Sequence, residues 1–321
     1  MAFTIVKPKK LHAGFRTFRD YLVTMLAFIA LSFFVYGWRV ILMFAIAALT
    51  ALFCDVAAAL LRGQNLDITD ISSVTFAWIF TMLMPASISY GVLILGICVT
   101  LLLGKHAFGG YGHYPFHPVA FGYAFTAICF TDDVFLYPEH SSDLGLGWTV
   151  DTELMNSPAY MLRQGGDPGI SRTDLLLGNF EGPIGAGFCL VALACIVLLI
   201  VHKATTWHVP AGFAVTCAVW AVLLPRISVS AFDSVILEMS TGTIPFAAAY
   251  LVAEPTSCPK NKTAKVIYGI VLGIVTMLYS RYGAYESGVC FALLICSPFV
   301  YWIDRFIGTG RFARRKGKDA V

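Results

Sequence analysis

The chain has 321 residues, of which 58% are hydrophobic and 13% charged, and its mean hydropathy is +0.76. A soluble domain carries roughly 25% charged residues, so this composition excludes a globule covered by water and favours a protein surrounded by lipid. The formal net charge of +3 is small, and we expect no nucleic-acid partner. The nine cysteines form no CxxC pair and no metal-ligand spacing. We interpret them as small buried hydrophobic side chains and expect no metal site.

Apolar segments recur along the whole chain. A helix that crosses the ~30 Å hydrocarbon core of a membrane needs about 20 apolar residues. We therefore predict an all-α polytopic membrane protein. Its roughly ten transmembrane helices are predicted at residues 21–37, 38–61, 71–87, 88–104, 117–131, 182–202, 208–225, 233–253, 264–281 and 285–303. The segments 71–87 and 117–131 are the weakest, and we expect them to tilt, break or pair as half-helices. The first of them should end at Pro85, because proline cannot continue a helix.

The positions of Lys and Arg predict the orientation in the membrane. With ten spans and the N-terminus inside, 17 of the 22 basic residues lie on the inner side and 5 on the outer side. The predicted segments are a basic cytoplasmic N-terminus at 1–20, a first membrane half of about five helices at 21–131, an extracytoplasmic loop at 132–181, a second membrane half of about five helices at 182–303 and a basic cytoplasmic tail at 304–321.

The first candidate site is the glycine-rich inner loop at 104–118. Its glycines, among them Gly110 and Gly112, permit backbone conformations closed to other residues, and aromatic residues alternate with them. One interpretation is an interfacial loop within an aromatic belt. The other is a pocket for a planar ring, in which His113 and His117 fix polar edges. The two histidines are four residues apart, but neighbouring prolines argue against a helix here, so we expect no metal.

The second candidate site is the end of the predicted outer loop. This loop is the only long polar one, and loops of such length are usually functional or disordered. Thr173 offers an exposed hydroxyl there, beside Ser171 and Arg172, and a glycine-rich stretch leads into the sixth span. The simpler interpretation of this stretch is a loop and a helix cap.

Acidic residues inside or near the spans form the third group, because ionisable side chains in a membrane are costly and are functional candidates. Asp55 lies well inside the second span and Glu238 within the eighth. We expect both to handle ions, with a hydrogen-bonded carboxyl between helices as the alternative for each. Asp70, Glu254 and Asp304 are predicted near the inner interface, where solvation lowers the cost of a charge.

These three clusters, in this order, resemble the family that contains the D subunit of the Rnf-type ion-translocating electron-transport complex and the B subunit of the sodium-translocating NADH:quinone reductase. The resemblance covers nearly the whole chain after residue 20, and the short N-terminus favours the Rnf side. It rests on Phe108–Pro118 for the family's FGGLGxNxFNPA stretch, Gly178–Gly185 for GNxxGSxG, Ala253–Pro259 for TDPxTSP and Tyr282–Val289 for YGxYPEGV.

The resemblance implies a covalent FMN, joined through a phosphoester bond to the threonine of an S/T-G-A-T motif. Ile170-Ser171-Arg172-Thr173 stands at that place and keeps the threonine but differs at the other three positions. Arg172 could instead pair with a phosphate. The resemblance also allows a second flavin, such as riboflavin, near the inner loop, where His113 and His117 can hydrogen-bond a ring edge.

The implied function is that of a membrane subunit in a redox pump that couples electron transfer between ferredoxin and NAD to Na⁺ or H⁺ translocation. Such a subunit would not be catalytic alone. It would lie in a bacterial cytoplasmic (inner) membrane, with other subunits of the complex, Na⁺ or H⁺, and the lipid bilayer as its partners. Two alternatives stay open. One is a stand-alone transporter, although the sequence shows no clear internal repeat of the kind common in transporters. The other is a scaffold without flavin, which the altered residues 170–172 favour.

Overall fold

The computed structural model describes residues 14–63, 69–142, 144–148, 150 and 153–307. Most of the predicted basic N-terminus and tail therefore lies outside the described residues. Helices make up nearly all of the regular structure, as the all-α prediction requires. The strands β1 (Tyr137–Pro138) and β2 (Leu154–Met155) form a two-residue antiparallel pair, with Tyr137 opposite Met155.

The first membrane half contains the five helices expected from the hydropathy pattern. α1 and α2 form a hairpin around Gly37, and the short α3 ends before Pro85, as predicted. α4 runs without interruption into the π-helix η1, so the two make one span. The bounds are α1 Phe15–Tyr36, α2 Trp38–Arg62, α3 Ser72–Met82, α4 Tyr90–Cys98, η1 Val99–His106 and α5 Pro118–Cys129.

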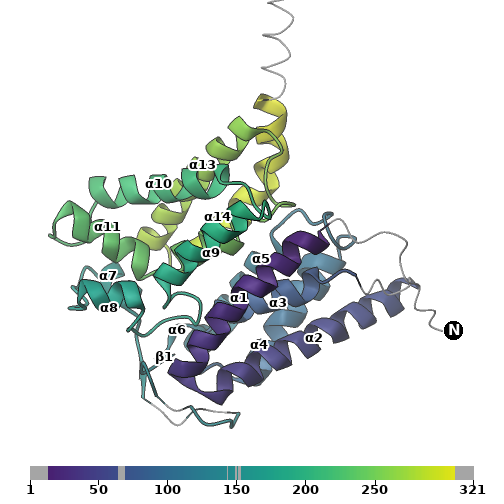
Figure 1. The fold of residues 1–321 in the computed structure, drawn as a ribbon, viewed down its shortest axis with the longest axis horizontal. Helices are drawn as coiled ribbons and strands as arrows, with labels where there is room; N and C mark the ends of the chain where they lie inside the picture. The colour runs from purple at the N-terminus through teal and green to yellow at the C-terminus, as the bar shows by residue number, and fades with distance from the viewer. Residues whose placement is uncertain (1–13, 64–68, 143, 149, 151–152, 308–321) are drawn as a thin grey trace, which may run out of the picture.

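The segment between the two halves gathers at one end of the helix bundle (Figure 1). It contains α6 (Thr131–Phe135), the two strands, α7 (Pro158–Arg163) and α8 (Arg172–Leu177). We call this the loop end. The opposite end carries the glycine-rich segment 107–117, and we call it the glycine end.

The second half departs from prediction in one span. The segment 233–253 is not one helix but two, α11 and α12, separated at residues 241–243. Pro245 has no N–H to donate into a preceding turn, and with Gly242 it prevents one continuous helix. The bounds are α9 Cys189–Val201, α10 His208–Leu223, α11 Ala231–Ser240, α12 Ile244–Tyr250, α13 Lys262–Tyr282, α14 Gly288–Cys296 and η2 Ser297–Phe299, with helical residues continuing to Ile307.

The two halves repeat one order of packing. α2 packs against α3, α4 and η1, and α10 packs in the same way against α11, α12 and α13. α5 then packs on η1, as α14 does on α13, while α5 with α14 and α1 with α9 join the halves. The sequence shows no clear internal repeat, yet the two halves share this order of contacts. The halves share an order of contacts rather than residues that a sequence comparison can match.

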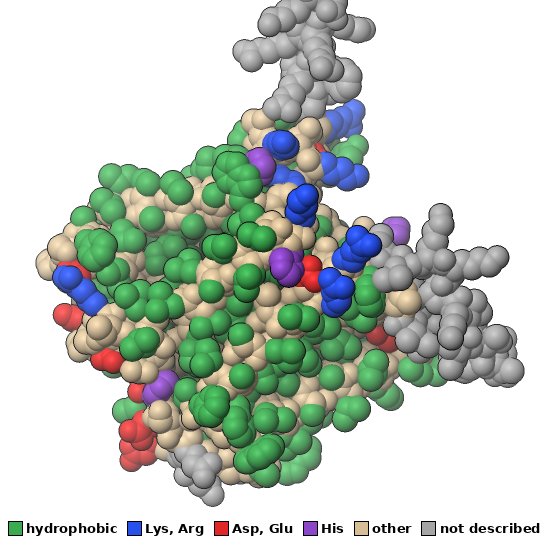
Figure 2. All heavy atoms as spheres, viewed as in Figure 1, with side chains coloured by type: hydrophobic (Ala, Val, Ile, Leu, Met, Phe, Trp, Pro, Cys, Tyr) green, Lys and Arg blue, Asp and Glu red, His purple; other side chains and the backbone are tan. Residues whose placement is uncertain are grey.

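The outer surface of the bundle is apolar. Four helices of the described chain, namely α1, α2, α13 and Gly288–Ile307, are long and apolar enough to cross a membrane, and no more than 39% of the apolar window in each is buried. Figure 2 shows hydrophobic side chains spread over the face between the ends, with Lys and Arg gathered near the C-terminal helix. An exposed apolar surface of this extent requires lipid or protein partners. The fold is that of a polytopic membrane protein.

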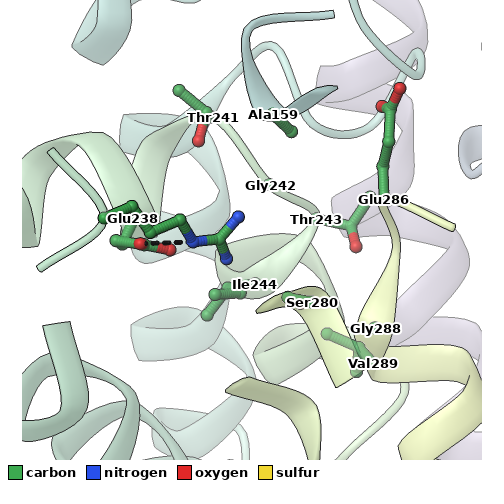
Figure 3. Close-up of a pocket in the computed structure, with 11 residues that line it drawn as sticks. Ala159, Glu238, Thr241, Gly242, Thr243, Ile244, Ser280, Glu286, Gly288 and Val289 are labelled. Carbon is green, nitrogen blue, oxygen red and sulfur yellow. Dashed lines mark ion pairs between the residues drawn. The ribbon is translucent and has the colours of Figure 1, made fainter. Parts of the chain in front are cut away.

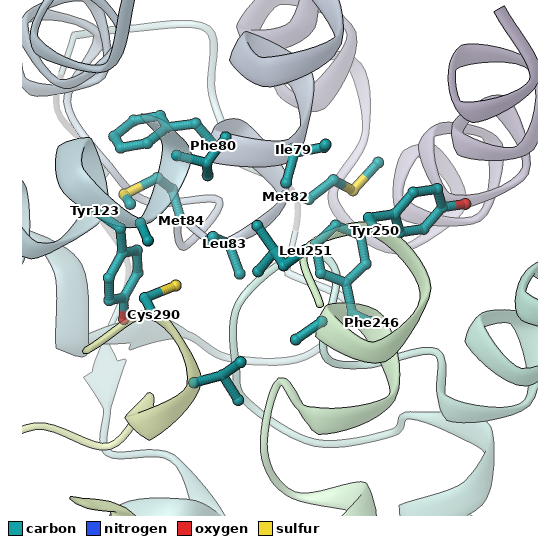
Figure 4. Close-up of a cluster of buried hydrophobic side chains, with 14 of the residues drawn as sticks. Ile79, Phe80, Met82, Leu83, Met84, Tyr123, Phe246, Tyr250, Leu251 and Cys290 are labelled. Atoms are coloured by element: carbon teal, nitrogen blue, oxygen red, sulfur yellow. The ribbon is translucent and has the colours of Figure 1, made fainter. Parts of the chain in front are cut away.

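The core lies where the two short helices α3 and α12 approach each other (Figure 4). Met82 and Leu83 at the end of α3, and Phe246 and Leu251 of the α12 region, are fully buried there. Seven of the nine cysteines are also buried, in line with their interpretation as small hydrophobic side chains. The segment before α9 crosses this core, since the Gly185 N–H donates to the Met82 carbonyl at 2.7 Å.

Candidate functional site

Asp55 belongs to a charged network at the glycine end. Lys105 Nζ donates to Asp70 Oδ2 at 2.9 Å and to the Ser73 hydroxyl at 2.6 Å. The Ser73 hydroxyl donates in turn to Asp55 Oδ1 at 2.5 Å, and His106 Nε2 lies 2.8 Å from the same oxygen. Three elements, α2, the start of α3 and η1, thus bring two carboxylates and two basic groups into one continuous chain of contacts.

The π-helix positions both basic groups of this network. The Ala107 N–H donates to the Leu102 carbonyl at 2.8 Å, and the Gly110 N–H to the Lys105 carbonyl at 3.1 Å, each across five residues. This wider turn lets the consecutive side chains of Lys105 and His106 reach different carboxylates. Single π-turns inside helices are frequent at functional sites.

The charge count along the sequence missed the role of Lys105, which entered it only as an inner positive charge. The side chain is fully buried, and a buried ammonium needs a paired carboxylate. Asp70 supplies that carboxylate with its side chain 19% exposed. The expectation that water at the interface solvates the Asp70 charge is therefore wrong. Asp70 mainly neutralises the buried ammonium of Lys105.

The glycine-rich loop has the backbone that the sequence predicts. Gly109, Gly110 and Gly112 have φ values of 116°, 92° and 79°, a region that side chains rarely allow. The structure does not bring the two histidines together. His113 is exposed, with Nδ1 3.0 Å from the Tyr111 carbonyl.

His117 lies on the inner side of this loop and is fully buried. Its ring packs edge-on to Phe76 with centroids 6.0 Å apart. Neither ring nitrogen has a hydrogen-bond partner among the described residues. A neutral buried imidazole in this state can donate one hydrogen bond and accept another, from a water or a ligand.

A second polar cluster fastens the same loop to the segment before α13. The Tyr114 hydroxyl donates to Glu254 Oε1 at 3.2 Å and lies 2.5 Å from the Thr256 hydroxyl. Glu254 is completely buried, and its other oxygen accepts the Ser257 N–H at 2.8 Å. The expectation of a solvated Glu254 is wrong. Its carboxylate accepts hydrogen bonds from Tyr114, Thr256 and Ser257.

Thr173 lies at the loop end, in the first turn of α8, with its side chain exposed. Its hydroxyl is 2.8 Å from that of Ser171, the residue that caps the helix by accepting the Asp174 N–H at 3.2 Å. Hydrogen bonds from Ser171 and Asn179 lower the pKa of the Asp174 carboxyl. The Thr173 hydroxyl is accessible, as a phosphoester linkage requires.

Arg172 forms an ion pair with Asp233 on α11. Its Nε lies 2.5 Å from Asp233 Oδ1, and its guanidinium also covers the ring of Phe232 at 5.8 Å. The predicted pairing of Arg172 with a phosphate would therefore compete with an existing ion pair. Sequence spacing cannot reveal this partner, which stands 61 residues away.

The glycine-rich stretch after Thr173 folds back so that Gly178 lies against Gly187. Gly178 has a φ of 87°, and a Cβ at this position would lie 1.3 Å from the Gly187 carbonyl oxygen. Its N–H donates to the Asp174 carbonyl at 2.7 Å. This packing holds α8, and with it the Thr173 hydroxyl, against the start of α9.

Glu238 is the second predicted ion-handling residue, and it is paired. Its Oε1 lies 2.7 Å from Nε of Arg226, and the two side chains are only 6% and 10% exposed. Figure 3 shows the pair beside the break between α11 and α12. Arg226 was predicted only as one of the outer positive charges, so this contact was missed.

Glu238 and Glu286 both line a small cavity beside this break. Glu286 belongs to the acidic residues expected inside or near the spans, but it was not predicted to handle ions. It lies in the loop between α13 and α14, where one carboxylate oxygen accepts from the Ser157 hydroxyl and, at 3.5 Å, from the Tyr137 hydroxyl. The other oxygen is buried without a hydrogen-bond partner in the described part of the chain. Burial raises the pKa of this carboxyl to about 7, against the opposing effects of the Ser157 hydroxyl and Arg163.

Comparison with known proteins links this arrangement to one family. A family model described as "NQR2, RnfD, RnfE family" matches residues 11–313. A protein of Salmonella arizonae, named as the D subunit of an ion-translocating oxidoreductase complex, is 26% identical over 354 aligned positions, which cover 99% of this chain and 100% of the relative. A protein of Escherichia coli O127:H6 with the same name is 25% identical with the same coverage of both chains.

Proposed function

The chain belongs to the NQR2, RnfD, RnfE family, and from this premise we propose that it is a membrane subunit of a redox-driven ion pump. The observation that carries the proposal is the end-to-end match to relatives named as the D subunit of an ion-translocating oxidoreductase complex. The apolar outer surface of the helices supports the membrane location. The other subunits of such a complex would be its partners.

In the proposed complex, electron transfer between ferredoxin and NAD drives Na⁺ or H⁺ across a bacterial cytoplasmic membrane. The subunit is not catalytic alone, and both of its termini face the cytoplasm. The excess of basic residues at the termini and on the predicted inner loops supports this orientation. With this orientation, Thr173 lies on the outer side.

We further propose that Thr173 carries FMN through a phosphoester bond. The accessible hydroxyl in the first turn of α8 fits such a linkage. Ser171 holds the turn in place, while Arg172 stays with Asp233 unless that ion pair opens. When bound, the flavin supplies the redox chemistry, and the protein supplies its position and surroundings.

A second flavin, such as riboflavin, is proposed at the glycine end. Gly110 and Gly112 bring the backbone close to a planar ligand. Both ring nitrogens of the buried His117 lack a partner within the described residues and can serve such a ligand. His113 is the exposed member of this site and would fix an outer edge.

Asp55 and Glu238 are proposed as the carboxylates of the ion route, one toward each end of the bundle. Each has a basic partner that can release it, His106 for Asp55 and Arg226 for Glu238. Coupling requires an element with two states that the redox reaction biases. If Asp55→Asn and Glu238→Gln both leave ion pumping intact, this part of the proposal is wrong.

The first test is in-gel flavin fluorescence after denaturing electrophoresis. Wild type, Thr173→Ala and the control Ser142→Ala are each co-expressed with a flavin transferase. Ser142 is a matched control, since its hydroxyl lies in the same loop and donates to the Glu139 carbonyl, far along the chain from Thr173. Fluorescence in wild type and control, absent from Thr173→Ala, is the expected result.

A dark wild-type band would contradict the covalent bond. Absorbance of the native protein then separates a dissociable flavin from a scaffold without flavin, the alternative that the altered residues 170–172 favour. A stand-alone transporter is the other alternative. The repeated packing order of the two halves supports it, since many transporters are built from repeats.

A further inference from the structure

The break between α11 and α12 opens a small polar cavity at the loop end. Two adjoining hollows share the lining residues Ala159, Thr241, Gly242, Thr243 and Glu286. The larger has a volume of about 20 Å³, enough for one water molecule or one small ion. Figure 3 shows the residues that line this region, which come from several separate segments.

The two carboxylates of this cavity differ in their charge balance. Glu238 is neutralised by Arg226 at 2.7 Å. Glu286 accepts only from hydroxyls, those of Ser157 and Tyr137, and its other oxygen has no hydrogen-bond partner within the described residues. The structure therefore holds one carboxylate with a counter-charge and one without.

The charged and titratable groups around Glu286 do not supply the missing charge. Tyr137 on β1 and Tyr123 on α5 face it as neutral phenols. The positive charge of Arg163 on α7 also acts on it, but that guanidinium donates to the Ala284 carbonyl. Arg226 stays with Glu238. In the described part of the chain, no basic nitrogen lies within ion-pair distance of Glu286.

A largely enclosed carboxylate without a counter-charge is costly, so such a group takes up a proton or binds a cation. The cavity offers hard oxygen ligands, namely the Glu286 carboxylate and the hydroxyls of Thr241, Thr243 and Ser287. Thr243 and Ser287 are already held 3.0 Å apart. Oxygen ligands of this kind suit a small hard cation.

We propose that Glu286 is the cation-binding carboxylate at the loop end and that it holds one small monovalent cation, H⁺ or Na⁺, in the cavity beside the α11–α12 break. In the proton case, the carboxylate and one H⁺ combine to give the neutral acid, and release reverses this without other reactants. Its role as the outer station of the ion route rests on the proposed function. The binding itself does not.

The test is difference infrared spectroscopy of the purified complex containing the full chain. The protonated carboxyl stretch is followed from pH 5 to 9 in wild type, Glu286→Gln and the control Glu139→Gln, an exposed carboxylate of the same end. We expect one band that titrates near neutral pH in wild type and control and is absent from Glu286→Gln. Ser157→Ala keeps the carboxyl but removes a donor to its charged form, so it should move the midpoint upward.

A series in Na⁺ distinguishes the two cations. If Na⁺ competes for the same carboxylate, a concentration ten times its dissociation constant lowers the midpoint by about one pH unit. A midpoint that does not respond to Na⁺ assigns the site to the proton alone. A titrating band that persists in Glu286→Gln, or no titrating band in folded wild type, would overturn the proposal. Absence of redox-driven pumping in a wild-type complex that shows the titrating band would instead refute the proposed function and leave the site.

Discussion

Breaking the buried pair Arg226–Glu238 should destabilise the protein strongly. Arg226→Met leaves the Glu238 carboxylate, 6% exposed, without its partner at 2.7 Å. Removal of one member of a buried pair costs about 3–5 kcal/mol, because an uncompensated charge remains, whereas replacing both members is often close to neutral. Both side chains are nearly shielded from water, so solvent screening reduces this figure little. The double variant Arg226→Met/Glu238→Gln should therefore recover most of the loss.

The chain contains a matched exposed pair for comparison. Arg172 and Asp233 form an ion pair with side chains 62% and 22% exposed. Exposed pairs contribute far less than buried ones, so Arg172→Met should destabilise the protein much less than Arg226→Met does. Reversible unfolding of each variant in detergent, followed by tryptophan fluorescence, gives the differences in free energy.

Either of two results would refute this reasoning. In the first, Arg226→Met costs no more than Arg172→Met. In the second, the double variant is as unstable as the single one. Either result would mean that the Glu238 charge is solvated or protonated in the folded protein and does not depend on Arg226.

Three further predictions concern stability. Gly178→Ala places a Cβ 1.3 Å from a backbone oxygen and puts alanine in a left-handed conformation. We therefore expect little folded protein by size-exclusion chromatography. The control Gly145→Ala should elute as wild type, because a Cβ there meets no atom within 4 Å. Lys105→Met leaves Asp70 without the ammonium at 2.9 Å and should cost about 3–5 kcal/mol in the same unfolding assay; a loss below about 1 kcal/mol would contradict a charged pair. Glu286 has a pKa raised to about 7 by burial, so its contribution to stability is present at low pH and is lost as pH rises through about 7. Thermal unfolding from pH 5 to 8 should show a pH-dependent loss of about 3 kcal/mol in wild type, and parallel curves for wild type and Glu286→Gln would contradict it.

Local rules predicted much of the fold. Helix length and hydropathy identified the membrane segments, and Pro85 marked the end of α3. The break at 241–243 was missed because a hydropathy window averages over Gly242 and Pro245, whose effects are steric and not hydrophobic. The glycine-rich loop was predicted correctly, since a left-handed backbone is a property of single residues.

The partners of the charged side chains could not be predicted. Counting Lys and Arg gives the sign of the charge on a loop but not the contacts of each side chain. Lys105 and Arg226 were therefore treated as surface charges, although both side chains are largely buried. Their carboxylates stand 35 and 12 residues away in the chain, brought near by helix packing. The environment of Glu286 was likewise missed, because it depends on a loop 129 residues earlier.

The central claim is that this chain couples electron transfer to ion movement within a complex. The most direct measurement is ion uptake by sealed inverted membrane vesicles with and without the chain, driven by reduced ferredoxin and NAD, with Na⁺ and H⁺ followed separately. We expect uptake that requires the electron donor and disappears, together with donor oxidation, when the chain is absent. Uptake that proceeds equally well without the donor would contradict the claim and identify a stand-alone transporter instead.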